Sequence, residues 1–385
     1  MSATSFCIIT EQEVRLFIQK GSLNAEQEMK LAMAGVILDD YLNVYDYVKT
    51  LQVASVWVND QKTSYALIEN IPAGVRLIKD MTPVAYTKCV KNAKEQENVR
   101  AAHLKDGVAM TKFMCWLKQN AGKVEMTEIS IAECVKSFRQ AQKGFVEESF
   151  TTIAGYGPHG AIIHYSATAE SNAKINPEGL LLVDSGGQYL EGTTDITRTF
   201  AMGPVTDEEK RHFTTVLKGN LRLGAVKFKE GCTGENLDMV ARQPLWEEGL
   251  DYNHGTGHGI GFVLNVHEVP ARINWKGRPG YGENDPFKPG MIVSNEPGFY
   301  KEGAHGVRLE NLILCQEAET TEYGRFLNFE TLTIVPFDLD AVDVTLLDSK
   351  EKQLLNDYHS RVYNELSAYM TEEELVWLKT ATRAI

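Results

Sequence analysis

Five polar side chains in the middle of the sequence are of the types that bind divalent metal ions. They are Asp184, Asp195, His258, Glu296 and Glu310. Four carboxylates brought to one place would repel one another and raise their pKa values unless cations compensate the charge. Two ions about 3.5–4 Å apart could share bridging carboxylates and a bridging hydroxide, which is a strong nucleophile at neutral pH. Such a centre would hydrolyse amides or esters.

The donor set also indicates which metals would fit. Oxygen-rich ligation with a single imidazole suits a hard or borderline ion, manganese before zinc, with cobalt also acceptable. Each residue alone has an ordinary interpretation: an aspartate ending a strand is usually a turn former, and a glutamate before proline is usually a solvated loop residue. The HGTGHG segment alone could be a flexible loop or a histidine pair on a helix. The five residues together favour the metal site.

The first two carboxylates lie on segments with the patterns of strands. An apolar run, Leu180–Val183, leads directly into Asp184, and after a glycine turn Thr194–Phe200 alternates with Asp195 on one face. A hairpin returning through these segments would bring both carboxylates together. The pattern leaves the register of that hairpin open.

The other three candidate ligands lie in the glycine-rich stretch from Tyr252 to Glu310, which holds four of the nine histidines. Glycine beside histidine lets the backbone approach whatever the imidazole binds, because no Cβ intervenes. We expect further strands at Met291–Ser294, Leu312–Cys315 and Phe326–Val335.

The remaining elements carry no chemistry by their own pattern. We expect helices over 90–120, near Thr127, near Thr206 with a capping box, and after Asp348 and Thr371. His103 lies on the apolar stripe of the first and is expected to be a packed core residue. We expect strands at 6–10, 14–18, Val53–Val58, Ser64–Ile68 and Ala161–Tyr165. A helix is expected from Asn24, with Met29, Ala32, Met33, Val36 and Ile37 on one face.

Composition limits the class of protein. At 385 residues two domains are expected, and a net charge of −13 argues against a nucleic-acid partner. No run of 18 apolar residues and no signal peptide is visible, so a membrane partner is not expected. Six scattered cysteines without a CxxC pair are typical of reduced thiols in a cytoplasmic protein.

The five residues, in their order and local contexts, resemble the pita-bread metallopeptidases. The contexts are HGTGHGIG around His258, NEPG around Glu296 and VRLEN around Glu310. That family includes methionine aminopeptidase, prolidase, creatinase and Xaa-Pro aminopeptidase, and the resemblance covers residues 85–385 strongly. His254 before His258 and His267 after it are similar to the long, eukaryotic-style Xaa-Pro aminopeptidases. The segments Gly160–Tyr165 and Phe329–Thr333 and the helical C-terminal segment also resemble that form.

The resemblance implies an α+β fold, with a pita-bread catalytic domain preceded by a small partial α/β domain. The implied domains are 1–82, a partial creatinase/prolidase-type N-terminal domain, 83–322, the catalytic domain, and 323–385, the end of the catalytic sheet with a C-terminal helical segment. It further implies a homodimer that removes an N-terminal residue preceding proline from peptides, by attack of a hydroxide bridging two divalent ions.

The resemblance also implies roles for individual residues. Asp184 and Asp195 would hold one ion, Asp195 and Glu310 would bridge to the second, and His258 and Glu296 would complete the second. Glu296 would carry the proton, and His164, His254 and His267 would surround the substrate. Arg308 would support the bridging carboxylate.

Two departures from the family pattern stand out. Residues 1–80 resemble only the later part of the second domain of longer members, and Val269 follows His267-Glu268 where related sequences usually have glycine. His159, His305 and Glu268 receive no role. The alternative functions are a prolidase, which acts on dipeptides, and a catalytically silent pita-bread module that binds peptides or proteins.

Overall fold

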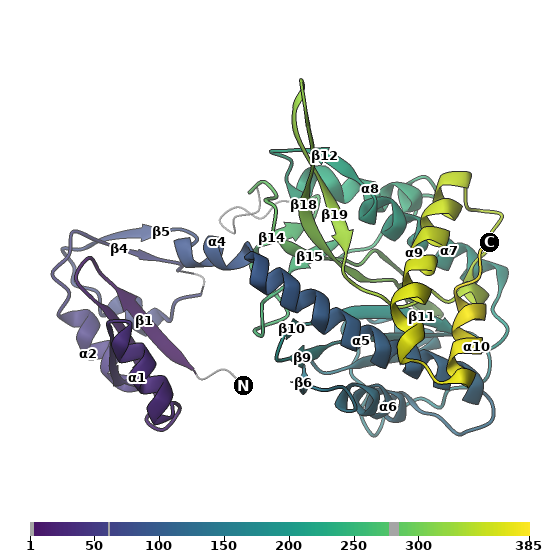
Figure 1. Ribbon diagram of the computed structural model, residues 1–385, viewed down its shortest axis with the longest axis horizontal. Helices are drawn as coiled ribbons and strands as arrows, with labels where there is room; N and C mark the ends of the chain where they lie inside the picture. The colour runs from purple at the N-terminus through teal and green to yellow at the C-terminus, as the bar shows by residue number, and fades with distance from the viewer. Residues whose placement is uncertain (1–3, 61, 277–284) are drawn as a thin grey trace. The chain divides into compact units, whose positions relative to one another are not determined.

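The computed structural model describes residues 4–60, 62–276 and 285–385. The chain forms two compact units that meet between Val84 and Ala85 (Figure 1). The expected α+β class is confirmed, because both units combine helices with sheets, and the strand pairs of the second unit are antiparallel among the described residues.

The first unit contains a three-stranded sheet, a two-stranded parallel sheet and three short α-helices. Its elements are β1 (Ser5–Ile9), β2 (Val14–Ile18), α1 (Ala25–Met33), β3 (Val36–Asp40), α2 (Val44–Lys49), β4 (Ser55–Val58), α3 (Tyr65–Glu69) and β5 (Arg76–Lys79). Its core is small and centres on four buried side chains: Phe17, Val44, Val48 and Leu67.

Two predictions for this unit are wrong. The segment Ser64–Ile68 is helical, because Leu67 alone of α3 turns into the core while Tyr65 is exposed. The expected helix from Asn24 ends at Met33, and Val36 and Ile37 belong to β3. Asn24 does cap α1, but no side chain of that helix is buried.

The second unit is built around long, well-capped helices. They are α5 (Ala93–Asn120), α6 (Glu128–Gln140), α7 (Asp207–Gly224), α8 (Gly234–Trp246), α9 (Ser349–Leu366) and α10 (Glu372–Ala381), with α4 (Pro83–Cys89) at the boundary between the units. Thr127, Thr206, Asp348 and Thr371 are N-caps as predicted, each accepting a hydrogen bond from the third helical N–H. His103 is buried in α5, as expected.

Among the described residues, the strands of the second unit form four sheets. Their bounds are β6 (Phe145–Glu148), β7 (Ile153–Tyr156), β8 (Leu180–Ser185), β9 (Gly187–Tyr189), β10 (Gly192–Thr193), β11 (Ile196–Ala201), β12 (Lys227–Lys229), β13 (Gly257–Gly259), β14 (Glu268–Ile273), β15 (Ile292–Asn295), β16 (Gly298–Lys301), β17 (His305–Arg308), β18 (Asn311–Thr321) and β19 (Gly324–Thr331). The sheet orders are β10-β9-β6, β11-β8-β7, β12-β19-β18-β15-β13-β14 and β16-β17.

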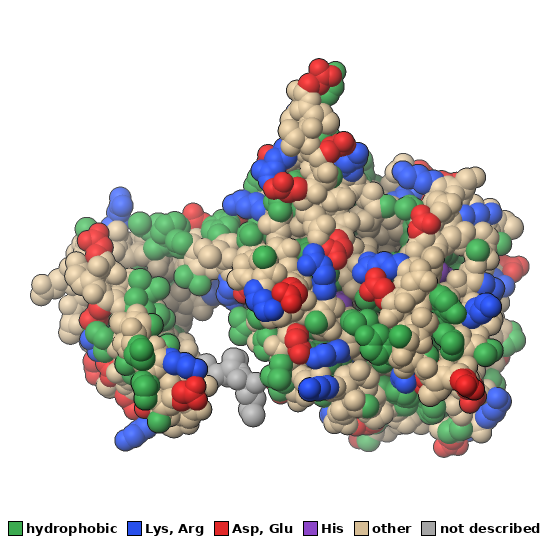
Figure 2. All heavy atoms as spheres, viewed as in Figure 1, with side chains coloured by type: hydrophobic (Ala, Val, Ile, Leu, Met, Phe, Trp, Pro, Cys, Tyr) green, Lys and Arg blue, Asp and Glu red, His purple; other side chains and the backbone are tan. Residues whose placement is uncertain are grey.

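Two of these sheets carry the candidate ligands. The predicted hairpin forms, since β8 and β11 pair antiparallel with Thr197 opposite Asp184. The β18–β19 hairpin extends away from the body of the unit, and both acidic and basic side chains lie along it (Figures 1 and 2). The expected strand at Ala161–Tyr165 does not form, because Gly157–Ala161 is a 3₁₀ helix.

Within the described residues, none of the helices combines the length and apolar character that a membrane crossing requires. All six cysteines are unpaired, in keeping with the expectation of reduced thiols. The core of the second unit lies between its helices and sheets, with Phe213 and Phe337 in one cluster and Phe113 and Phe200 in another.

Candidate metal centre

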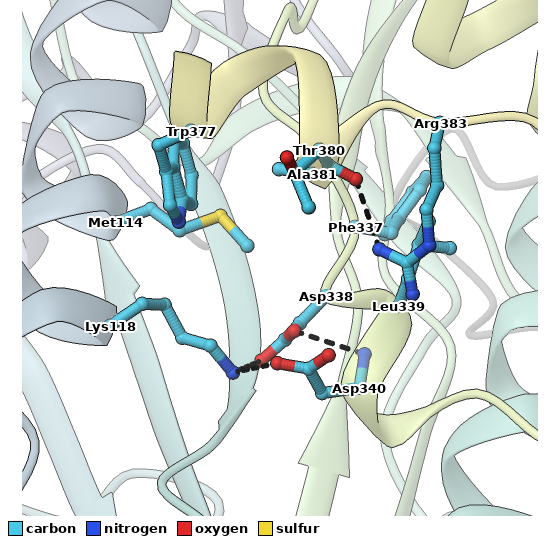
Figure 3. Close-up of a pocket in the computed structure, with 10 residues that line it drawn as sticks. All are labelled: Met114, Lys118, Phe337, Asp338, Leu339, Asp340, Trp377, Thr380, Ala381 and Arg383. Carbon is cyan, nitrogen blue, oxygen red and sulfur yellow. Dashed lines mark hydrogen bonds and ion pairs between the residues drawn. The ribbon is translucent and has the colours of Figure 1, made fainter. Parts of the chain in front are cut away.

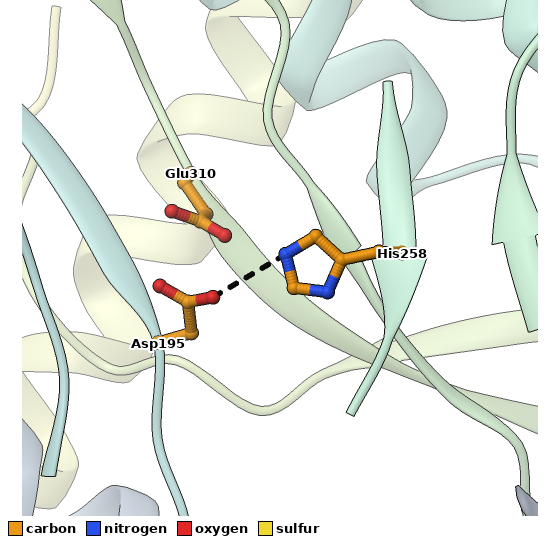
Figure 4. A group of neighbouring side chains, drawn as sticks. All are labelled: Asp195, His258 and Glu310. Carbon is orange, nitrogen blue, oxygen red and sulfur yellow. Dashed lines mark ion pairs between the residues drawn. The ribbon is translucent and has the colours of Figure 1, made fainter. Parts of the chain in front are cut away.

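Three of the five predicted ligands, Asp195, His258 and Glu310, converge on one point (Figure 4). One ligand atom from each lies within 4.8 Å of the other two, with both carboxylates buried and the imidazole half-buried. The Nε2 atom of His258 lies 3.5 Å from Asp195 Oδ2. A divalent ion between these atoms would have two oxygen ligands and one nitrogen ligand.

The other two predicted ligands flank this group. Glu296 Oε1 lies 3.5 Å from His258 Nε2. Asp184 faces the group from β8, and after burial its charge is among the causes that raise the pKa values of Asp195, Glu296 and Glu310. All five side chains therefore belong to one electrostatic neighbourhood.

The cluster is incomplete as the polypeptide leaves it. Asp184 Oδ1 and Glu310 Oε1 are buried, and among the described residues neither has a hydrogen-bond partner. Burial raises the pKa of Glu310 well above its usual range and that of Glu296 to about 7. A buried carboxylate oxygen without a partner is costly, so these atoms fit a site that cations complete.

Charge balance supports the same conclusion. Four carboxylates face one guanidinium, that of Arg308, whose Nη2 donates to Asp184 Oδ2 at 2.6 Å. The hydrogen bond to Asp195 and the charge of Glu296 outweigh burial and raise the pKa of His258 to about 9. Without metal, the imidazole thus takes up a proton where a cation would otherwise bind, so the residues fit two divalent ions.

Thr197 joins the two halves of the site. Its carbonyl accepts from the N–H of Glu310 at 3.0 Å, and its Oγ1 donates to Glu310 Oε2 at 2.8 Å. On the far side, β15 and β18 pair with Asn295 opposite Asn311. Glu296, which follows β15, and Glu310, which precedes β18, therefore lie at the same end of two neighbouring strands.

The glycines beside His258 serve strand packing. A Cβ on Gly257 would lie 1.9 Å from the carbonyl oxygen of Ser294, and one on Gly259 would lie 2.4 Å from that of Glu268. The expectation that they let the backbone approach a ligand is therefore corrected: they let β13 fit between β14 and β15.

Hydrogen bonds fix the orientation of the two HGTGHG imidazoles. His258 Nδ1 lies 3.1 Å from the carbonyl of Gly259, which leaves Nε2 directed at the carboxylates. His254 Nδ1 lies 2.8 Å from the Gly255 carbonyl, and Nε2 lies 2.8 Å from Tyr300 Oη. Burial, then the charge of Arg308, lowers the pKa of His254 to about 3, so this imidazole is neutral and accepts the tyrosine O–H.

Arg308 connects this histidine to the ligands. Besides Asp184, its Nη1 donates to Tyr300 Oη at 2.9 Å and its Nε to Thr197 Oγ1 at 3.2 Å. His254 Nδ1 lies 4.0 Å from Glu296 Oε2. Arg308 and His254 thus lie beside the cluster, but the carboxylate that Arg308 contacts is Asp184 and not one of the two that the resemblance implied to bridge the ions.

His164 and His267, the other predicted substrate-side histidines, are both exposed. The His267 ring makes an edge-to-face contact with the ring of His258, with centroids 4.2 Å apart. After larger contributions, His164 is among the charges that lower the pKa of His254. Both positions suit a histidine that faces solvent and an entering molecule.

Arg198 supports the site, and the sequence reasoning gave it no role. It is fully buried, donates to the Glu310 carbonyl at 2.6 Å and to the Val335 carbonyl at 2.8 Å, and stacks over Phe337. Its Nη2 also lies 3.0 Å from Tyr358 Oη. The signal in the sequence was an arginine on the apolar face of a predicted strand, between Ile196 and Phe200.

The residues left without a role have partners of their own. His305 Nε2 lies 2.9 Å from His212 Nδ1, His159 Nδ1 lies 2.8 Å from Glu128 Oε1, and Glu268 forms a buried ion pair with Lys91.

A separate pocket between α5, α10 and the segment after β19 contains none of the predicted site residues (Figure 3). There Lys118 Nζ bridges Asp338 at 2.8 Å and Asp340 at 2.7 Å, so its carboxylates already have a cation. This pocket does not compete with the cluster as a metal site.

Three family models match the chain. Residues 97–317 match metallopeptidase family M24, residues 325–385 match the C-terminal region of peptidase M24, and residues 2–95 match the creatinase/prolidase N-terminal domain.

Known proteins of similar sequence include a probable Xaa-Pro aminopeptidase P from Paracoccidioides brasiliensis, 38% identical over 99% of this chain and 64% of that protein. Xaa-Pro aminopeptidase 2 of Sus scrofa is 37% identical over 99% of this chain and 57% of its own length. The chain therefore spans about three fifths of the length of these relatives.

A solved structure gives the same result for the fold. The X-prolyl aminopeptidase of Caenorhabditis elegans, described as a cytosolic enzyme with a di-nuclear active site, superposes with a TM-score of 0.93. It is 33% identical, and the match covers 100% of this chain and 64% of that one. Prolidase from Pyrococcus furiosus, at 23% identity and a TM-score of 0.66, shares the fold. The predicted fold is confirmed.

Proposed function

Because the chain belongs to metallopeptidase family M24, we propose that it is a dinuclear-metal aminopeptidase. Its reaction is hydrolysis of the bond between an N-terminal residue and a following proline. The observation that carries the proposal is the cluster of Asp195, His258 and Glu310, flanked by Asp184 and Glu296, with two buried carboxylate oxygens that have no hydrogen-bond partner in the described part of the chain. The named activity of the similar Xaa-Pro aminopeptidases supports this substrate class.

Asp184 and Asp195 would hold one ion, with Asp195 and Glu310 reaching the second and His258 and Glu296 completing it. Manganese is the metal we expect, before zinc or cobalt, because the set has four carboxylates and one imidazole. When bound, two such ions lower the pKa of a water molecule between them and so provide a nucleophile near neutral pH.

The chain's own residues would then handle the proton and the substrate. A bond to proline lacks an N–H, and its nitrogen must receive a proton as the bond breaks. Glu296 would carry that proton; its Oε1 accepts from Ser294 at 3.0 Å and its Oε2 lies 4.0 Å from His254 Nδ1. His254, whose pKa is lowered by burial and by the charge of Arg308, would orient the carbonyl as a neutral imidazole, with His164 and His267 at the open side.

Peptide hydrolysis by the metal-loaded protein tests this proposal. The protein, with manganese added, is incubated with Xaa-Pro-Yaa peptides and with Xaa-Pro dipeptides, and release of the first residue is followed. We expect release from the longer peptides and none from an Asp195→Ala variant. Cleavage of dipeptides alone would assign a prolidase, and equal inactivity of both proteins with manganese bound would assign a silent binding module.

The cell compartment and the oligomeric state complete the proposal. We propose that the protein is cytosolic, as the related enzyme of Caenorhabditis elegans is described, and that it is a homodimer, as the family resemblance implies. Sedimentation of the purified protein measures its oligomeric state directly.

A further inference from the structure

The loop that carries His267 over the site spans residues 260–267 and joins β13 to β14. His258 stands two residues before the loop, and the His267 ring rests against the His258 ring. At the centre of the loop Val263 has φ 51°, a backbone conformation that a β-branched residue rarely adopts. Such a conformation persists only where surrounding contacts impose it, so the loop needs external ties.

The tip of the loop is tied to the hairpin that bears the aspartates. The carbonyl of Leu264 accepts from Gln188 Nε2 at 2.8 Å and from Thr193 Oγ1 at 3.2 Å. Gln188 and Thr193 are paired in the β9–β10 ladder, between Asp184 and Asp195 in the sequence. The tip therefore follows the position of the first half of the site.

Besides the sheet pairing of Gly259 with Glu268 and the hydrogen bond from the Ile260 N–H to the Ile292 carbonyl, a buried ammonium ties the base of the loop. Lys91 is 2% exposed and lies between α4 and α5, far from the loop in sequence. Its Nζ donates to the Ile260 carbonyl at 2.6 Å and forms an ion pair with Glu268, which is 8% exposed and adjacent to His267. One charged group thus joins the two ends of the loop.

We infer that Lys91 and Glu268 are positioning residues for His267, an inference that rests on the proposed function for the role of that histidine. A buried ion pair is a poor source of stability, because the desolvation cost offsets most of the attraction. Its geometric effect is larger: with the ammonium removed, the Ile260 carbonyl and the Glu268 carboxylate lose their common partner. The sheet pairing of Gly259 with Glu268 then remains, but the Glu268 side chain next to His267 is no longer fixed, and His267 leaves the His258 ring.

The chain offers a matched control for this inference. Lys88 also contacts Glu268, with Nζ 3.2 Å from Oε1, but its side chain is 49% exposed. Lys91→Met and Lys88→Met therefore make the same chemical change on the same carboxylate, once inside the protein and once at its surface. Surface ion pairs contribute little, so Lys88→Met is expected to behave as the unmodified protein does.

Hydrogen exchange in the metal-free protein tests the geometry without any assay of activity. We expect the amides of residues 260–267 to exchange at least about tenfold faster in Lys91→Met than in Lys88→Met. Glu268→Gln, which keeps the side-chain volume, is expected to give the same result and serves if Lys91→Met does not fold. Equal exchange in the variants and the unmodified protein would overturn the inference.

Kinetics of the manganese-loaded protein then test the link to His267. We expect Lys91→Met to lower kcat by roughly 10- to 100-fold with little change in KM or in bound manganese. On a His267→Ala background, the same substitution should cost almost nothing, because the two changes act through one group. Additive losses, or loss of manganese in step with activity, would overturn the inference. If no variant or parent cleaves Xaa-Pro peptides, the proposed function fails while the exchange result still decides the role of Lys91.

Discussion

Two buried glutamates, Glu128 and Glu310, differ in how far the protein satisfies the hydrogen-bonding capacity of their carboxylates. Glu128, at the start of α6, accepts four hydrogen bonds between 2.8 and 2.9 Å. The donors are Tyr156 N, His159 Nδ1, Tyr165 Oη and Ala173 N. Glu310 accepts one side-chain hydrogen bond, from Thr197, and its Oε1 has no partner among the described residues.

The difference separates a structural carboxylate from one that is placed for binding. The polypeptide completes Glu128, which ties both ends of the segment carrying His164 to α6. It leaves Glu310 incomplete beside Asp195 and Glu296, where burial and their charges raise its pKa. Buried polar groups are normally satisfied, so an exception in a cluster of like charges indicates a missing cation.

The largest expected effect comes from Glu310→Gln. We expect hydrolysis of an Xaa-Pro-Yaa peptide to fall by about a thousandfold, corresponding to ~4 kcal/mol, because a bridging ligand is lost. Without metal the same change should raise the free energy of unfolding, by about 1 kcal/mol, since a carboxylate whose folded pKa is raised destabilises the fold at neutral pH. Urea denaturation in chelator and metal analysis by mass spectrometry measure these changes. If the metal-free variant is less stable than the metal-free parent, Glu310 is a structural carboxylate like Glu128.

Arg308→Met comes next, because it removes the guanidinium that balances Asp184. We expect the metal-free protein to lose about 3–5 kcal/mol of stability, the usual cost of leaving a buried charge without its partner. Added manganese should restore part of this loss, because the ions neutralise the same carboxylates. Thermal unfolding with and without metal measures both effects. Arg308→Lys is the control that keeps the charge but not the three-way hydrogen bonding.

Glu128→Gln makes the substitution of the first prediction at the satisfied carboxylate. An amide nitrogen would face donors in place of an acceptor, so we expect a loss of about 1–3 kcal/mol of stability. Manganese content should stay at its original value, because no candidate ligand contacts Glu128. Urea denaturation and metal analysis are again the measurements. Loss of metal without loss of stability would reverse the comparison.

The smallest effect concerns a buried pair of bases, His212 and His305. Burial, then the charge of His305, lowers the pKa of His212 to about 4. The unfolded chain, with a histidine pKa near 6.5, binds the proton more tightly, so this contribution to stability is complete above that pH and is lost between about 6.5 and 4. We expect His212→Gln to flatten the decline of unfolding free energy across that window, as measured by urea titrations at several pH values. An unchanged slope would contradict the assignment.

The sequence predicted the parts of this fold that depend on neighbours along the chain. The caps at Thr206, Asp348 and Thr371 are confirmed because an N-cap needs only the third residue of its helix. The predicted hairpin through Asp184 and Asp195 is also confirmed, because its two strands are close to each other in the sequence. Ser64–Ile68 was assigned wrongly because five residues are too few to separate a strand pattern from one turn of helix.

The supporting residues were beyond such reasoning. Lys91 meets Glu268 at a separation of 177 residues, and Arg198 meets Pro336 at 138. Nothing local distinguishes Lys91 from Lys88, and only the folded chain shows that one is buried and the other half-exposed. The roles of the five ligands stay predictions until metal binding is measured.

The hydrogen bonds of Arg198 connect helix α9 in the C-terminal segment to the candidate metal centre. This side chain donates hydrogen bonds to the Glu310 carbonyl, to the Val335 carbonyl and to the hydroxyl of Tyr358 in α9. Proteolytic trimming that removes α9 would therefore strip the support beneath a metal ligand without touching any ligand itself. Metal affinity becomes a reporter of whether the C-terminal end is intact.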